Sequence, residues 1–165
     1  MNAPAATHVL GVDPGLNVTG YGVVELTSRG PRLAEAGVVR GGRGGAIESR
    51  LAKLHNGLVE VIDAFKPEAM SLEELYSHYA RPRTAILMGH ARGVLCLAAY
   101  QAGVPVFHYA ATQVKRMLTG SGRAPKSQMQ HAIQRELGLR TFPEPSDVAD
   151  ALAIALCHCY SREKS

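Results

Sequence analysis

Three short segments rich in β-branched residues precede the first helical segment of this sequence, and no other feature constrains the fold as strongly. They cover residues 8–12, 18–26 and 33–39. Pro14 and Gly30 mark the turns between them, and connections this short join antiparallel strands. The chain is therefore predicted to open as an antiparallel meander, in which Gly20 and Gly22 of the second strand let another backbone approach closely.

The rest of the chain alternates helical and extended segments. Helices are predicted at residues 46–65, 84–101, 111–118, 126–137 and 147–160, and further strands at 69–75 and 104–109. Ser146 is expected to cap the last helix. This order predicts an α/β fold, with a five-stranded mixed sheet flanked by helices on both faces. We expect residues 1–165 to form a single domain and residues 1–7 to be a disordered lead-in.

A glycine-rich run, RGGRGG at residues 40–45, separates the third strand from the first helix. Such a run can contact RNA, but one short copy between two elements is typical of a flexible connector. We therefore expect a connector at this point of the chain.

The charges of the chain are distributed unevenly. Lys and Arg number 18 against 14 Asp and Glu, and the formal net charge of +4 is compatible with a nucleic-acid partner. No acidic residue lies between Glu74 and Glu136, so the stretch between them is purely cationic. Its Lys and Arg residues are Arg81, Arg83, Arg92, Lys115, Arg116, Arg123, Lys126 and Arg135.

The cysteines and the apolar runs exclude other classes of protein. Cys96, Cys157 and Cys159 cannot pair completely and lie in apolar runs, which is typical of a reduced, cytoplasmic protein with buried thiols. Cys157, His158 and Cys159 point in different directions on a helix and cannot share one metal ion. No apolar stretch is long enough to span a membrane, and the amino terminus lacks the pattern of a signal peptide.

Four acidic residues stand where a charge is costly to bury. Asp13 closes an apolar strand, and Glu73 lies near the end of the fourth strand. Asp147 and Asp150 open the last helix and share one of its faces. Each acid also has an ordinary alternative. Asp13 suits a turn, Glu73 suits an exposed strand surface, and Asp147 suits the positive end of a helix dipole.

If the first and fourth strands are neighbours, their ends converge with the start of the last helix at one edge of the sheet. Closely spaced carboxylates repel one another, and hard divalent cations such as Mg²⁺ or Mn²⁺ relieve that repulsion. Two such ions close together make a phosphoryl-transfer site, in which one activates the attacking water and the other stabilises the leaving oxygen. The four acids therefore predict a two-metal site.

Several motifs occur in the order and spacing of a known family. They are GVDPG at residues 11–15, TGYG at 19–22, LEELY at 72–76, HARG at 90–93 and DVADALAIA at 147–155. With these motifs the chain resembles the RuvC family, the bacterial Holliday junction resolvases of the RNase H-like superfamily. The resemblance covers nearly the whole chain apart from its two ends. The glycine motif alone also occurs in actin-like ATPases, whereas the combination is specific.

The resemblance implies an endonuclease that resolves Holliday junctions in DNA recombination and repair. Such an enzyme is a homodimer that binds four-way junction DNA, nicks two strands symmetrically and leaves 5′-phosphate and 3′-hydroxyl ends. Family members need Mg²⁺ or Mn²⁺ and prefer a short thymine-containing sequence. They cooperate with the RuvA and RuvB branch-migration proteins.

The resemblance also assigns roles to individual residues. It implies that Asp13, Glu73, Asp147 and Asp150 are the catalytic metal ligands, and some family members carry His at the position of Asp147. It places Lys126 beside the reacting phosphate, as a cation that stabilises developing charge.

A DNA-binding surface is expected around these acids, because bases stack on aromatic side chains and phosphates attract cations. The resemblance places Tyr76 against junction bases and Lys115 and Lys126 at the DNA surface, and their sequence neighbours are basic. Each cation taken alone could be an ordinary solvated surface residue. The expected DNA-binding residues are Tyr76, Arg81, Arg83, Lys115, Arg116, Arg123 and Lys126.

Gly89 and Gly93 lie four residues apart in the second predicted helix. Small residues at this spacing permit close packing, either on the sheet of the same chain or on a second subunit. We favour the second alternative, a dimer interface.

Three other functions are compatible with part of the pattern. An actin-like ATPase shares the glycine loop but needs two such domains and a far longer chain. A YqgF-type RNase H-like nuclease acting on RNA shares the fold class. A non-catalytic junction-binding module is disfavoured, because four acids would repel DNA without serving a reaction.

Overall fold

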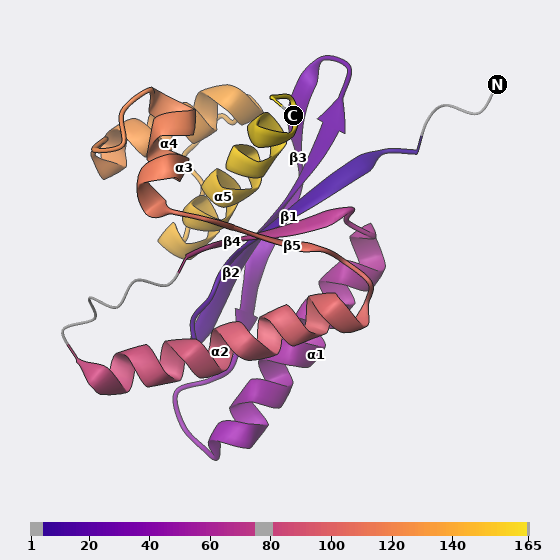
Figure 1. The fold of residues 1–165 in the computed structure, drawn as a ribbon, viewed down its shortest axis with the longest axis vertical. Coiled ribbons are helices and arrows are strands. Elements are labelled where there is room, and N and C mark those ends of the chain that lie inside the picture. Colours follow the sequence, from indigo (N-terminus) through magenta and orange to yellow (C-terminus); the bar gives the residue numbers. More distant parts are fainter. Residues whose placement is uncertain (1–4, 75–80, 165) are drawn as a thin grey trace.

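The sheet has five strands in the order β3-β2-β1-β4-β5 (Figure 1). A computed structural model describes residues 5–74 and 81–164. The strands are β1 (Thr7–Asp13), β2 (Val18–Thr27), β3 (Gly30–Arg40), β4 (Ala69–Glu73) and β5 (Val106–Tyr109). The pairs β1–β2 and β2–β3 are antiparallel, and the pairs β1–β4 and β4–β5 are parallel. The predicted mixed sheet with an antiparallel meander at its start is therefore confirmed.

Helices cover both faces of this sheet, also as predicted (Figure 1). They are α1 (Ile47–Phe65), α2 (Pro82–Gln101), α3 (Ala111–Thr119), α4 (Lys126–Leu137) and α5 (Ser146–Arg162). Alternate residues of β1 enter two separate cores, because successive strand side chains point to opposite faces. Leu10 packs with Leu54 of α1, and Val9 packs with Leu152 of α5.

Two glycines of the sheet let α5 lie directly on β1 and β2. A Cβ atom at Gly11 would stand 2.0 Å from the carbonyl oxygen of Ala151, and one at Gly20 would stand 2.2 Å from the carbonyl oxygen of Asp147. No side chain fits at such distances, so the close approach expected from glycine in the meander is confirmed at Gly20. It places the first turn of α5 over the carboxyl end of β1.

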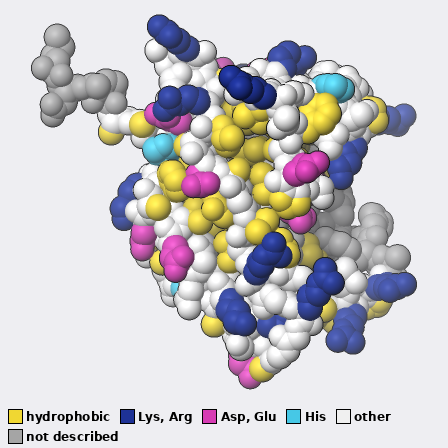
Figure 2. All heavy atoms as spheres, turned by 180° about the vertical axis from the view of Figure 1, so that it is seen from behind, with side chains coloured by type: hydrophobic (Ala, Val, Ile, Leu, Met, Phe, Trp, Pro, Cys, Tyr) yellow, Lys and Arg dark blue, Asp and Glu magenta, His cyan; other side chains and the backbone are white. Residues whose placement is uncertain are grey.

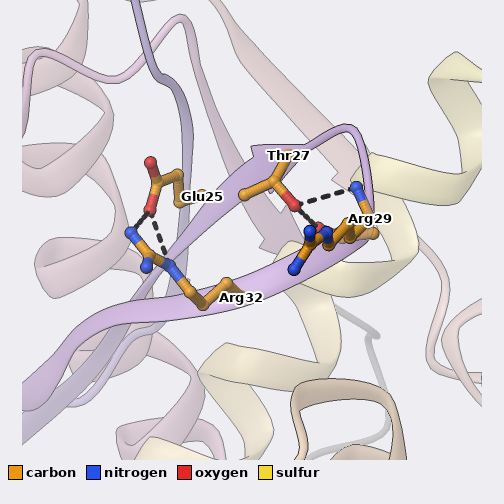
Figure 3. Close-up of polar contacts among 5 residues, drawn as sticks. Glu25, Thr27, Arg29 and Arg32 are labelled. Atoms are coloured by element: carbon orange, nitrogen blue, oxygen red, sulfur yellow. Dashed lines mark hydrogen bonds and ion pairs between the residues drawn. The ribbon is translucent and has the colours of Figure 1, made fainter.

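The hairpin between β2 and β3 is tighter than the sequence suggested, so the third strand is longer than the predicted 33–39. Thr27 and Gly30 still pair, and the Thr27 hydroxyl donates a hydrogen bond of 2.7 Å to the carbonyl oxygen of Gly30 (Figure 3). The same hydroxyl accepts one of 3.2 Å from the amide of Arg29. Gly30 has a φ of 111°, which only glycine adopts without strain.

Other predicted boundaries also shift. Thr7 pairs with Leu26, so the lead-in predicted for residues 1–7 is wrong at its last residue. β4 ends at Glu73 rather than at residue 75, which lies outside the described residues. β5 begins at Val106 rather than 104, because Pro105 has no amide hydrogen to donate and contributes only its carbonyl, to the amide of Met70.

α3 and α4 begin at the predicted residues, whereas the starts of α1, α2 and α5 differ from prediction by one or two residues. α2 begins at Pro82, where a fixed φ suits the first helical turn, rather than at 84. The predicted cap by Ser146 is wrong: Pro145 occupies the cap position, and no side chain caps α5. Ser146 lies inside the first turn, where its hydroxyl is no longer placed to receive the free amides.

Cys157, His158 and Cys159 are buried in the core of the protein. Both cysteines are buried free thiols, as expected. The His158 ring lies 2.6 Å from the Tyr109 hydroxyl, through Nδ1, and burial lowers the pKa of this histidine and favours its neutral form. Within residues 5–74 and 81–164, no helix combines the length and the apolar character needed to cross a bilayer.

Candidate active site

Two parallel strand ends and one helix start meet at a single edge of the sheet. Asp13 ends β1 and Glu73 ends β4, and the register pairs the residues just before them, Val12 with Leu72. Asp147 and Asp150 lie in the first turns of α5, which rests on Gly20 opposite Asp13. The convergence expected from the sequence is therefore present.

Asp13 is the centre of the acidic group. Its carboxyl group is hydrogen-bonded to those of Asp147 and Asp150. Burial, followed by the negative charges of Asp150, Asp147 and Glu73, raises the pKa of Asp13 to about 8. In the protein without metal, Asp13 therefore favours its protonated form at neutral pH far more than an ordinary aspartic acid does.

Burial and nearby cations shift the pKa values of two further carboxylates, Glu73 and Asp150, in opposite directions. Burial and then Asp150 raise the pKa of Glu73, whereas Lys115 and Arg92 lower it. Desolvation raises the pKa of Asp150, and Lys126 lowers it. Asp150 itself reaches solvent, although α5 is buried from the next residue onward. Lys115 thus lowers the pKa of Glu73 and Lys126 lowers that of Asp150, the two acids that lie toward β4, α3 and α4.

The donor set suits a hard divalent cation, since carboxylate oxygens are the ligands that Mg²⁺ and Mn²⁺ prefer. Among the described residues, no three His, Cys, Asp or Glu side chains are placed so that they could already hold a metal ion. The raised pKa of Asp13 reflects its burial and the uncompensated charges of Asp150, Asp147 and Glu73. A bound cation would offset the repulsion among the four acids, so the residues fit the ion chemically once Asp13 ionises and the side chains reorient.

A cavity of about 290 Å³ opens beside Glu73 and Asp150. Lys115 from α3 and Lys126, the first residue of α4, line it together with those two acids. Its deeper wall is apolar and is formed by α3, α4 and α5. The predicted pairing of basic residues with the acidic site is therefore present for both lysines.

The other expected DNA-binding residues are less closely tied to the acids. Arg116 and Arg123 are exposed on α3 and on the loop before α4. Arg81 and Arg83 are exposed at the start of α2. Tyr76 lies outside the described residues. The structure brings the two lysines to the acids, and leaves the four arginines on the surface around them.

Arg92 is a residue of this site that the sequence did not single out for a role. Its Nη1 donates a hydrogen bond of 2.5 Å to the carbonyl oxygen of Glu73, and its Nη2 contacts Nδ1 of His108. Glu73 lies one residue beyond the β1–β4 ladder and is the last residue of β4 that pairs with β5, so Arg92 ties α2 to the end of β4 at the site. The available signal was an arginine between Ala91 and Gly93, in the middle of a helix without acids.

Comparison with known proteins gives one consistent family. A family model described as crossover junction endodeoxyribonuclease RuvC matches residues 9–158. A relative of that name from Rhodopirellula baltica is 56% identical over 158 residues, which cover 94% of this chain and 88% of that protein. Another of that name, from Pelotomaculum thermopropionicum, is 45% identical over 152 residues and 92% of each chain.

Solved structures agree with the sequence relatives. A structure described as T. thermophilus RuvC in complex with Holliday junction substrate matches with a TM-score of 0.90 and 38% identity over 96% of each chain. The Fowlpox virus Holliday junction resolvase matches with a TM-score of 0.56 but only 12% identity, covering 94% of this chain and 99% of that one, and so shares the fold alone. With a family model that spans nearly the whole described chain and relatives above 40% identity, this chain belongs to the RuvC family of crossover junction endodeoxyribonucleases.

Proposed function

We propose that this protein resolves four-way DNA junctions by metal-dependent nicking of two strands. The observation that carries the proposal is the convergence of Asp13, Glu73, Asp147 and Asp150 at one edge of the sheet, beside Lys115 and Lys126. The names of the relatives and the junction bound in the T. thermophilus structure support DNA junctions as the substrate. Family membership also supports nicks with 5′-phosphate and 3′-hydroxyl ends and cooperation with RuvA and RuvB.

The four acids are the residues that would hold Mg²⁺ or Mn²⁺, two ions in each site. Bound there, such ions would lower the pKa of a water molecule and neutralise charge on the phosphate. The part played by the chain is to gather the acids on fixed strand and helix ends. With such ions bound, Asp13 would ionise more readily, because its raised pKa of about 8 reflects burial and uncompensated neighbouring charges.

The lysines supply positive charge beside Glu73 and Asp150. Lys126 begins α4, and both it and Lys115 line the cavity next to Glu73 and Asp150. An ammonium group fixed there stabilises charge that develops on the phosphate oxygens. We therefore assign Lys126 a catalytic role and Lys115 a role in binding the phosphate backbone.

The activity is tested with a synthetic four-way junction, incubated with and without Mn²⁺. We expect paired, symmetric nicks that depend on the metal. A structured RNA of similar length is the comparison substrate. Cleavage of the RNA with an intact junction would instead indicate an RNA-directed nuclease, and binding without any nicking would indicate a junction-binding module.

Replacing Lys115 or Arg123 with Ala is expected to weaken the salt dependence of junction binding. Each lost phosphate contact lowers the slope of log affinity against log salt by about 0.9. Fluorescence anisotropy without divalent ions measures this slope. Lys164→Ala, an exposed lysine at the far end of α5, is the control and should leave the slope unchanged. An unchanged slope in both test variants would place the DNA on another surface.

We also propose that α2 forms the homodimer interface. Its inner face is buried in the core through Ala91, Leu95, Ala98 and Ala99. An opposite stripe at helical spacing is exposed, and a Cβ atom at Gly89 or Gly93 would meet nothing within 4 Å. These glycines therefore do not serve packing on the chain's own sheet. The exposed apolar members of the stripe are Ile86, Leu97 and Tyr100.

Leu97→Glu is expected to convert the dimer into a monomer, because it places a charge within the proposed apolar interface. Sedimentation velocity at micromolar protein measures the change. Phe142→Glu, at an exposed aromatic residue outside α2, is the matched control and should remain dimeric. A Leu97→Glu protein that sediments as a dimer would rule out α2 as the interface.

A further inference from the structure

We propose that the connection between β3 and α1, residues 40–45, contacts the DNA backbone on the side of Asp13 away from Lys115 and Lys126. This inference rests on the proposed function, since it extends the surface on which the junction would lie. It assigns the contact to Arg40 and Arg43, which lie outside the purely cationic stretch of the sequence.

The strand register places Arg40 at the acidic edge. Asp13 pairs with Gly20, and Gly20 pairs with Val38, so these three residues form one row across the sheet. Arg40 pairs with Val18, two residues further along both strands toward the same edge. The end of β3 therefore lies beside the ends of β1 and β4, where Asp13 and Glu73 stand.

Alternation along the strands also sets the face. Gly20 faces α5, since a Cβ atom there would meet the backbone of Asp147. Residues two apart on a strand face the same side, and directly paired residues do so as well. Val38 packs against the core under α5, and Val39 packs against the opposite core. Arg40 is therefore on the same face of the sheet as Asp13 and the first turn of α5.

The spacing suits a phosphate backbone. Two strand spacings separate β3 from β1, which amounts to about 10 Å across the sheet. Along the axis of duplex DNA, which rises by about 3.4 Å for each nucleotide of one strand, this distance spans about three base pairs. A strand whose scissile phosphate lies at the acids thus carries further phosphates within reach of Arg40 and Arg43.

Hydrogen bonds anchor the first half of this connection, which its composition alone did not predict. The amides of Gly41 and Gly42 donate hydrogen bonds of 3.0 and 3.3 Å to the carbonyl oxygen of Asn17, in the turn that follows Asp13. The Arg50 guanidinium, from the first turns of α1, donates to the Asn17 side chain and, over 2.6 Å, to the carbonyl oxygen of Gly42. The loop is therefore attached directly to the β1–β2 turn of the site.

The positive charge of this connection is available to a ligand. Among the ion pairs of the described residues, none involves Arg40, Arg43 or Arg50, and Arg40 and Arg43 are exposed. The nearest acid in the sequence, Glu48, is exposed on the first turn of α1. Figure 2 shows Lys and Arg side chains on the lower part of this face of the molecule as well as along its upper edge.

The opposite end of β3 provides a contrast on the same strand. Arg32 there forms an ion pair with Glu25, and Arg29 lies in the hairpin turn at the far edge of the sheet (Figure 3). A nonspecific effect of lost positive charge would be the same at both ends. An effect of position would appear at the Arg40 end alone.

The test compares two double variants, Arg40→Gln with Arg43→Gln and Arg29→Gln with Arg32→Gln. Junction affinity is measured by fluorescence anisotropy between about 50 and 200 mM salt, without divalent ions so that no nicking occurs. We expect the first variant to lower the salt slope by about 1 to 2 and the affinity by on the order of tenfold or more at about 100 mM salt. The second variant should bind like the unchanged protein.

A third variant, Arg40→Lys with Arg43→Lys, separates charge from local structure and should restore most of the slope. Equal losses in both glutamine variants, or no loss in either, would overturn the inference. Loss in the Arg40 variant that lysine does not restore would also overturn it, because it would indicate damage to the loop. If the unchanged protein itself does not bind junctions, the proposed function fails first, and that outcome is distinct from a failure of the loop alone.

Discussion

Asp13→Asn is expected to abolish metal-dependent nicking while junction binding persists. The side chain is the central carboxylate of the group, hydrogen-bonded to Asp147 and Asp150, and an amide cannot neutralise a divalent cation in its place. Loss of about 4 kcal/mol of transition-state stabilisation would slow nicking by on the order of 10³-fold. Single-turnover nicking in Mn²⁺ and anisotropy without metal measure the two properties separately.

Glu74→Gln is the matched control for this variant. It removes one negative charge from the next residue after Glu73, but its side chain is exposed and makes none of the contacts of the acidic group. We expect nicking close to that of the unchanged protein. Loss of both binding and nicking in a folded Asp13→Asn protein would contradict a purely catalytic role for Asp13.

Asp13→Asn is also expected to change how the stability of the metal-free protein depends on pH. The folded-state pKa of Asp13, about 8, lies above its ordinary value of 3.8. The folded protein therefore keeps a proton that the unfolded chain loses, and stability is lost as pH rises from about 4 to about 8. Asn cannot ionise, so the Tm of Asp13→Asn should fall less between pH 6 and pH 8. Parallel Tm profiles for the two proteins would contradict the raised pKa.

Gly11→Ala is expected to destabilise the protein strongly, although it adds only one methyl group. The added Cβ atom would stand 2.0 Å from the Ala151 carbonyl oxygen and 2.8 Å from the Ala155 amide nitrogen, both backbone atoms that cannot rotate away. Overpacking of this kind costs about 3 kcal/mol, which corresponds to a fall in Tm of roughly 10 °C for a chain of this size. Thermal unfolding followed by circular dichroism measures it.

Gly44→Ala is the control, because a Cβ atom there would meet nothing within 4 Å. Its Tm should stay close to that of the unchanged protein. Displacement of α5 also moves Asp147 and Asp150, so Gly11→Ala should lose nicking activity at temperatures where it remains folded. An unchanged Tm for Gly11→Ala would show that α5 does not rest on β1 as closely as the structure has it.

Much of the fold and of the candidate site could be predicted from the sequence because the signals are local. Helical spacing of apolar residues and the turn residues between strands depend only on near neighbours, and they predicted every helix and strand of the described chain. The boundaries were less accurate where a single turn decided them. Thr27 and Gly30, for example, close a turn that extends β3 beyond its apolar core.

The sequence by itself determined the order of elements, and it placed the four acids that we propose as metal ligands at strand and helix ends. Only the tertiary structure decided that β1 lies beside β4, that Arg92 holds the carbonyl of Glu73, and that Arg40 shares a face with Asp13. It also showed that Gly89 and Gly93 lie on the exposed face of α2, where an added Cβ atom would meet nothing within 4 Å. The physical reason is that strand order, register and helix docking depend on contacts between residues far apart in the chain, which no local pattern of residues specifies.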